Sequence, residues 1–129
     1  MKFSAITLAT VLTVLGGVAA DEMQIWDECV LQSNGARACS RGRFSHFTTS
    51  FGRFWIRGID GCHGSSSGVL HQEELCIDSY NRRAHFRFPG QPNRCMAVSR
   101  SYETNQAPCV SDGTTNCRVN VYNEVACTW

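Results

Sequence analysis

Lysine is almost absent from this sequence. The only lysine among 129 residues is Lys2, so eleven arginines carry nearly all of the side-chain positive charge. A phosphate-binding loop of the G-x-x-x-x-G-K-[ST] type is therefore excluded. The planar guanidinium of arginine suits the recognition of phosphate, carboxylate and bases better than lysine does. A chain without lysine also offers no side-chain amine to ubiquitin, which would suit a protein that enters the cytosol of another cell. Codon bias and chance are the alternative explanation.

Long apolar runs are missing after the N-terminus. Residues 1–20 combine Lys2, an apolar stretch at 5–15 and the small residues 18–20, a pattern typical of a secretory signal peptide. No later run is long enough to span a membrane, and the C-terminus lacks the apolar tail of a lipid anchor. We expect a single domain at residues 21–129, secreted to the extracellular space and without a membrane span.

Metal-binding cysteine spacing and glycosylation sequons are also absent. No two cysteines stand two to four residues apart, as zinc knuckles require, and no Asn-X-Ser/Thr sequon occurs in residues 21–129. An even number of cysteines in a short exported chain predicts four disulfides, whose pairing the sequence leaves open. We expect no metal and no cofactor. The eight cysteines are Cys29, Cys39, Cys62, Cys76, Cys95, Cys109, Cys117 and Cys127.

One helix and about five strands are expected. Met23, Trp26, Cys29 and Val30 recur at helical spacing, and acidic residues at the start suit the helix dipole, so residues 21–34 are predicted to be a helix. We expect an α+β fold, mainly an antiparallel β sheet with one N-terminal helix, in a small disulfide-rich secreted domain. Residues 69–80 are open between a short helix at 69–75 and a strand at 75–79. The other expected strands are 51–59, 83–88, 95–100, 117–122 and 124–129.

Acidic residues are missing from residues 29–59 and 79–102, each of which carries five arginines. If the two alternating strands in these blocks share a sheet, an arginine-rich face lies above an aromatic core. Arginines with an aromatic side chain between them can hold phosphates while a base stacks. The alternative is a solvated outer face whose arginines pair with two acidic blocks, residues 21–28 and 60–78, each with four acids. The predicted binding residues are Arg53, Trp55, Arg57, Arg83, His85 and Arg87.

No catalytic motif is recognisable. No serine stands in a nucleophile-elbow pattern, and every cysteine is expected in a bridge. His85 is the best candidate for acid–base chemistry, with Glu73 or Glu74 as its partner, but the spacing does not bring them together. We therefore assign no catalytic residue. A small secreted ribonuclease that uses His85 with Arg83 and a glutamate is the alternative.

The layout of the chain resembles a broad class. A signal peptide, about a hundred mature residues and eight cysteines are similar to the small secreted cysteine-rich proteins of fungi. Many of those act as effectors or toxins toward a host or competitor, so the resemblance implies a virulence function and, for some members, entry into host cells.

A second resemblance is to secreted fungal guanyl-type ribonucleases. It rests on residues 54–56, the Gly/Ser-rich loop 58–68, residues 83–86 and the terminal residues 125–127. The resemblance implies a helix on a curved antiparallel sheet and a disulfide joining the chain ends. The family's catalytic glutamate would fall near Arg53, yet residues 51–59 hold no acid, and no histidine follows residue 85. Arg83 could stand for the family's catalytic arginine. The resemblance thus implies an effector relative that keeps the fold and lacks the enzyme.

The leading functional interpretation is a secreted, monomeric, effector-like protein that binds a host or competitor macromolecule without catalysis. Its partner would be a protein, an RNA or a glycan, bound through the arginine and aromatic side chains. The alternatives are the ribonuclease and an antimicrobial or cell-wall-binding protein, for which Trp26, Trp55 and Tyr80 are the candidate contacts.

Overall fold

The computed structural model describes residues 20–42, 44–64, 67–109 and 115–129. The predicted signal peptide lies outside these ranges except for Ala20. The described residues form nine strands and no helix, so none of their elements is a helix that could cross a membrane. The strands are β1 (Glu22–Leu31), β2 (Arg37–Arg41), β3 (His46–Thr49), β4 (Gly52–Trp55), β5 (Gly61–His63), β6 (Glu74–Asp78), β7 (Arg83–Arg87), β8 (Arg94–Thr104) and β9 (Thr115–Val125).

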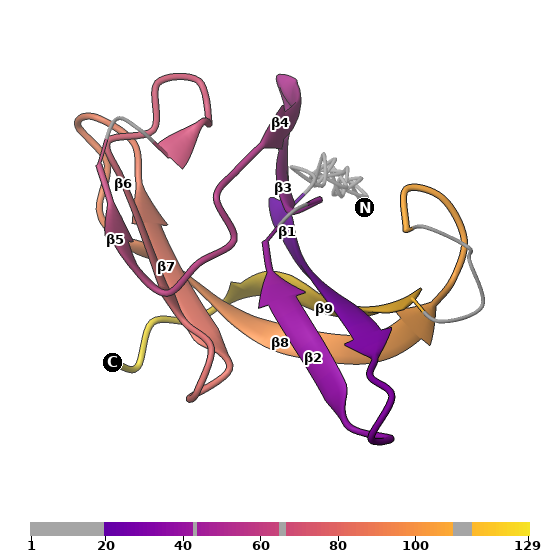
Figure 1. Cartoon of the computed structure of the whole chain (residues 1–129). Coiled ribbons are helices and arrows are strands. Elements are labelled where there is room, and N and C mark those ends of the chain that lie inside the picture. Colours follow the sequence, from indigo (N-terminus) through magenta and orange to yellow (C-terminus); the bar gives the residue numbers. More distant parts are fainter. Residues whose placement is uncertain (1–19, 43, 65–66, 110–114) are drawn as a thin grey trace, which may run out of the picture.

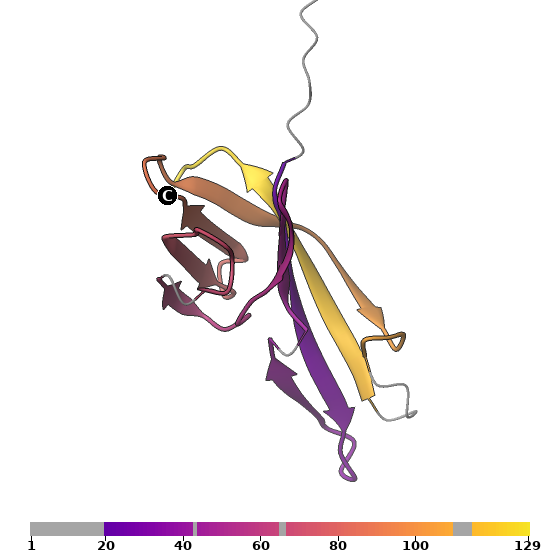
Figure 2. The ribbon, with the colours of Figure 1, turned by 90° about the horizontal axis from the view of Figure 1, so that it is seen from above.

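All nine strands belong to one antiparallel sheet that curls into half of a barrel (Figure 1). The strand order is β4-β3-β1-β9-β8-β7-β6-β5, and β2 pairs with the second half of β1. In Figure 1, β5–β7 form the wall at the left, and β8 and β9 cross below to β1, β3 and β4. Seen from above, β1, β8 and β9 extend beyond the curled part, alongside β2 (Figure 2). We call the side of the sheet toward the hollow the inner face and the opposite side the outer face.

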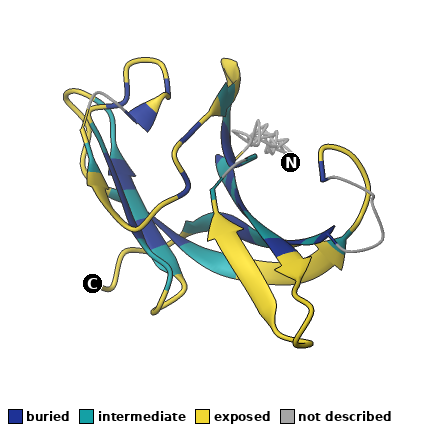
Figure 3. Cartoon of the chain, in the orientation of Figure 1, coloured by how far each residue is buried: buried dark blue, intermediate teal, exposed yellow. Residues whose placement is uncertain are grey.

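The main core fills the hollow. Phe47 of β3 and Phe86 of β7 meet edge to face, with ring centroids 4.9 Å apart, so side chains of the two walls touch across the core. Figure 3 shows buried residues along the strands of both walls. The core contains Met23, Ile25, Phe47, Ile56, Val69, Leu75, Ile77, Ala84, Phe86, Met96 and Tyr122.

A second, smaller core lies on the outer face of β1 and β9. Trp26 of β1 stands opposite Val119 of β9, and these side chains pack with Phe44 and the disulfide of Cys109 and Cys117. The next register pair, Ile25 and Asn120, belongs to the inner face because side chains alternate along a strand. Both faces of β1 are therefore covered.

The predicted N-terminal helix at residues 21–34 is wrong, and the fold is all-β rather than α+β. That segment is the central strand β1, paired with β9 on one side and with β3 and β2 on the other. Met23 and Ile25 are buried on the inner face, whereas Trp26 is buried on the outer face. A strand buried on both faces loses the simple polar–apolar alternation. Its apolar residues then fall by coincidence at helical spacing.

The other predicted strands are confirmed in part: β4 covers only four residues of the segment predicted at 51–59, and β2, β3 and β5 were not predicted. The open segment 69–80 contains the strand β6, and β8 and β9 extend the strands predicted at 95–100 and 117–122. The strand predicted at 124–129 is not formed, because β9 ends at Val125 and the chain continues without regular structure. A bulge between Val98 and Arg100 interrupts the pairing of β8 with β9. Bulges increase local bend and twist, which fits the curl of the sheet.

Four disulfides use all eight cysteines, which confirms the predicted number. Two of them join residues directly opposite each other on neighbouring strands, in β1–β2 and in β5–β6. A link between the chain ends, which the ribonuclease resemblance implies, is not among them. The pairs are Cys29–Cys39, Cys62–Cys76, Cys95–Cys127 and Cys109–Cys117.

Candidate binding site on the outer face

The curl of the sheet separates the six predicted binding residues into two groups. Arg53 and Trp55 project from the outer face of β4, because Phe54 between them packs against the main core. Arg83, His85 and Arg87 project from the outer face of β7, on the opposite wall. The two groups therefore point away from each other. The alternation predicted the correct side of each strand, but the curl places these sides on opposite surfaces of the molecule (Figure 1).

The arginines of β7 are paired with carboxylates. The guanidinium of Arg83 lies 3.2 Å from Asp78, and that of Arg87 lies 3.0 Å from Glu73. These acids belong to the block that precedes β7, and β6 and β7 pair antiparallel. This part of the surface consequently has little excess positive charge to offer an anion, as in the alternative of a solvated face tied to acidic blocks.

His85 lies close to Glu74, one of the two glutamates considered as its acid–base partner. Its Nε2 lies 3.6 Å from Oε1 of Glu74 on β6. The pocket beside it has a volume of 240 Å³ and is closed by Trp129, whose ring lies under the guanidinium of Arg83 at 5.3 Å. Arg83, His85 and a glutamate are thus near one another.

The arginines of the β4 side have no such partners. Arg53 on β4 and Arg57, just beyond the strand, are both exposed. No hydrogen bond or ion pair joins either guanidinium to another residue of the described ranges. Trp55 keeps 63% of its surface exposed. The β4 side therefore combines an open indole face with unpaired positive charge.

Beside Arg53 and Trp55 lies a cavity of 340 Å³, which we call the aromatic cleft. Register explains part of its composition: Trp55 stands opposite His46 on β3, which stands opposite Gln24 on β1. Same-face side chains on paired strands are neighbours, so three strands build one continuous wall. The cleft is lined by Gln24, Trp26, Phe44, His46, Arg53, Trp55, Ala107 and Pro108.

Hydrogen bonds hold Trp26 at the base of this wall. Its backbone N–H donates to Oγ of Ser45 at 3.0 Å, and its carbonyl accepts from the N–H of Gly42 at 2.8 Å. The indole Nε1–H donates to Oε1 of Gln24 at 3.1 Å. The two bonds of the Trp26 backbone lie where β1 changes its pairing partner from β3 to β2. They satisfy backbone groups that neither of these strands pairs with. The edge of Trp26 packs on Phe44, with centroids 6.4 Å apart.

His46 is a neutral acceptor in the wall. Burial lowers its pKa below the ordinary value, the positive charge of Arg53 acts in the same direction, and the ring is only 5% exposed. Its Nδ1 lies 3.4 Å from the carbonyl oxygen of Phe44, so Nδ1 carries the hydrogen and Nε2 is left as an acceptor. That Nε2 is buried and has no hydrogen-bond partner.

The cleft contains residues that the sequence analysis did not assign to the site. Gln24, Phe44 and His46 were not candidate binding residues, and Trp26 was considered only as a contact of an antimicrobial or cell-wall-binding protein. The predicted helix concealed Gln24 and Trp26, because they share a face only in a strand. The alternation of residues 22–25 ends where Ile25 and Trp26 are both apolar, so it was too short a signal to indicate a strand beside β4.

The comparisons add no assignment. No family model matches the chain, and comparison with curated proteins and with solved structures found no match. The function is therefore argued from the geometry of the cleft.

Proposed function

We propose that this protein is a secreted, non-catalytic binding protein of the effector type, and that its aromatic cleft binds single-stranded RNA. The observation that carries the proposal is the exposed ring of Trp55 beside the unpaired guanidinium of Arg53. A base stacks on the indole while the guanidinium contacts its phosphate, which is how sequence-tolerant single-strand binding works.

Stacking on the Trp55 ring favours a single strand over a duplex. A base must leave its stack to offer its faces to Trp55, and single strands do this at low cost. A glycan would use the ring but has no need of the guanidinium. The charge next to the ring therefore favours an anionic ligand.

The number of phosphate contacts is small. Of the six residues first predicted, Arg53 and Arg57 keep unpaired guanidinium groups within the described part, whereas Arg83 and Arg87 are neutralised. For single strands the logarithm of the affinity falls with the logarithm of the salt concentration, with a slope of about −0.7 for each phosphate contacted. We expect a slope between about −0.7 and −1.4.

Export and the effector role are part of the proposal. Four disulfides are typical of proteins that work in oxidising surroundings. The signal-peptide pattern of residues 1–20 and the resemblance to small fungal effectors point in the same direction. The near absence of lysine would suit a protein that later enters a host cell.

The test is a titration of oxidised protein, residues 21–129, with a fluorescently labelled eight-nucleotide RNA at two salt concentrations. The RNA is run on a gel afterwards. The proposal predicts binding with the shallow salt slope given above and intact RNA. Absence of binding to RNA, together with retention on insoluble cell-wall polysaccharide, would overturn it in favour of the wall-binding alternative.

One observation favours a second function. The 3.6 Å contact of His85 with Glu74, close to Arg83, is the group of residues that the ribonuclease alternative requires. If that alternative holds, the RNA is cleaved, and the variant His85→Ala abolishes cleavage while binding at the aromatic cleft persists. Intact RNA with the wild-type protein would exclude this alternative.

A further inference from the structure

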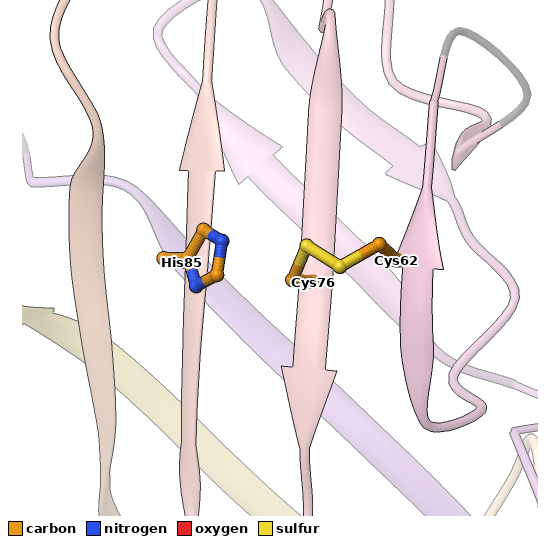
Figure 4. Close-up of side chains that lie close together, drawn as sticks. All are labelled: Cys62, Cys76 and His85. Atoms are coloured by element: carbon orange, nitrogen blue, oxygen red, sulfur yellow. A yellow bond between two sulfur atoms is a disulfide. The ribbon is translucent and has the colours of Figure 1, made fainter. Parts of the chain in front are cut away.

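Three potential metal ligands lie in one row on the β5–β7 wall. Cys62 on β5 stands directly opposite Cys76 on β6, which stands directly opposite His85 on β7. Their side chains project from the same side of the sheet, and the imidazole lies beside the disulfide sulfurs (Figure 4). One nitrogen or sulfur atom from each residue lies within 4.8 Å of the others. Elsewhere in the described ranges, no other group of three such ligand atoms is this close.

Glu74 offers a carboxylate beside His85, outside the close group of three. Its Oε1 lies 3.6 Å from Nε2 of His85, and it is on the same face of β6 as Cys76, two residues along the strand. Two atoms that bind zinc tetrahedrally at about 2.0–2.1 Å are separated by about 3.3–3.4 Å. The nitrogen and oxygen are therefore already close to that spacing. Two sulfurs, one imidazole and one carboxylate are all groups that bind zinc.

The disulfide blocks this site, because a cysteine sulfur binds zinc only as a thiolate. We propose that Cys62–Cys76 is a thiol-gated metal site: reduction of this bridge by a small thiol such as glutathione creates a zinc site of Cys62, Cys76, His85 and Glu74. This function is independent of the proposed RNA binding.

The chemistry balances as an ordinary thiol–disulfide exchange. An external thiolate attacks Sγ of Cys62, the sulfur–sulfur bond breaks, and its electron pair goes to Sγ of Cys76, which takes up a proton. A second external thiol resolves the mixed disulfide, so two thiols are oxidised to one disulfide and the protein gains two electrons and two protons. Zn²⁺ then displaces those two protons from the cysteines.

The position of the bridge suits this role. Cys62 is exposed on β5, which is an edge strand, so an external thiolate can reach its sulfur. Cys39 and Cys127 are exposed as well, whereas Cys109 and Cys117 are both buried. Loss of the edge bridge leaves the other three disulfides and the pairing of β6 with β7 in place, so His85 and Glu74 stay in position.

The bridge Cys29–Cys39 is a matched internal control. It also joins directly opposite residues of neighbouring strands, and its Cys39 is exposed. No His, Asp or Glu of the described ranges completes a three-ligand group with it. After reduction it should bind zinc more weakly than the Cys62–Cys76 bridge does.

The experiment reduces the protein stepwise with glutathione, maps free thiols by alkylation and mass spectrometry, and titrates Zn²⁺ against a chromophoric chelator. We expect the protein in which Cys62–Cys76 is reduced to bind one Zn²⁺ with its near-ultraviolet circular dichroism retained. His85→Ala should weaken zinc binding at least tenfold and Glu74→Gln should weaken it less, whereas Arg87→Gln should leave it unchanged.

Two results would overturn the proposal. These are unfolding on reduction of Cys62–Cys76, and zinc binding that His85→Ala leaves unchanged. None of them bears on RNA binding by the oxidised protein, so the two proposals fail separately.

Discussion

The outer faces of β4 and β7 carry the same sequence pattern and have different properties. Both alternate basic and apolar side chains, and both turn the apolar ones toward the main core. On β7, the neighbouring acids neutralise the arginines. On β4, the neighbouring strand β3 supplies His46, and the positive charge of Arg53 is left unpaired beside a ring. The pattern of one strand determines which side its residues face, whereas the chemistry of that side depends on the strand next to it.

The largest effect on stability is expected from a substitution at Gly58, which packs against Ser45 behind the aromatic cleft. A Cβ added at Gly58 would lie 2.2 Å from Oγ and 2.7 Å from Cβ of Ser45, which holds Trp26 in place. Because the neighbouring backbone of Gly42 is only 3.0 Å away, the clash cannot be relieved by a side-chain rotation alone. We expect Gly58→Ala to lower the free energy of unfolding by about 3 kcal/mol, measured by urea denaturation.

Gly64→Ala is the matched control for that variant. A Cβ at Gly64 would have its nearest neighbour at 3.9 Å, which is ordinary contact. This variant should stay within about 1 kcal/mol of the wild type. Equal destabilisation by both variants would contradict the close packing described for Gly58.

A smaller effect, on binding alone, is expected from Trp55→Ala. Stacking of a base on an aromatic side chain contributes about 1–3 kcal/mol, so the affinity for single-stranded RNA should fall by about fivefold to 150-fold. Because the ring is largely exposed, the melting temperature should change little. Tyr80→Ala removes a 94% exposed aromatic ring at a turn away from the cleft and should leave the affinity unchanged.

The core positions of the sheet could be predicted from sequence to a useful degree. Phe54 and Phe86 were placed on the core side of their strands by alternation, and the cysteine count predicted four bridges. The strand β1 was missed because a second core covers its outer face and removes the alternation on which the method depends. Its apolar spacing was therefore indistinguishable from that of a helix.

The candidate site was less predictable than the core. The curl depends on the pairing of all the strands, with a bulge at Val98 and Arg100, and neither is visible in local periodicity. In a flat sheet Arg53 and Arg87 would share one surface. In the curled sheet they point away from each other. His46 joins the site only through its register with Trp55, which is a property of two strands together.

Acid should weaken the β3–β4 side through His46. Burial lowers the pKa of this histidine in the folded protein, so its contribution to stability is complete above its ordinary pKa of 6.5 and is lost as the pH falls toward the folded value. Burial raises the pKa of Asp27, which acts in the opposite direction. The comparison of wild type with His46→Phe, by urea denaturation from pH 7 to pH 5.5, isolates the histidine. We expect a smaller loss of stability in the variant.

His71→Asn is the control for this titration. His71 is exposed, and asparagine tolerates its positive φ of 60°. This variant shows how the removal of a histidine outside the β3–β4 sheet pairing affects the profile. A His46→Phe profile identical to the wild type would contradict the role given to burial.

The smallest effect is expected from the ion pairs of β7. The pair of Arg87 with Glu73 is largely exposed, and such pairs contribute about 0–1 kcal/mol. Arg87→Gln should therefore lower the free energy of unfolding by no more than about 0.5 kcal/mol in low salt, and by less in high salt. A loss of several kcal/mol would show that the pair holds the β6–β7 wall together.

The central claim is that the surface beside β4 binds the ligand and that the surface of β7 does not. Its most direct test compares Arg53→Gln with Arg87→Gln in a titration with the same labelled RNA at low salt. The account predicts weaker binding and a salt slope closer to zero by about 0.7 for Arg53→Gln, and wild-type behaviour for Arg87→Gln. Weaker binding for Arg87→Gln, with Arg53→Gln unchanged, would contradict it and would move the binding surface to the opposite wall.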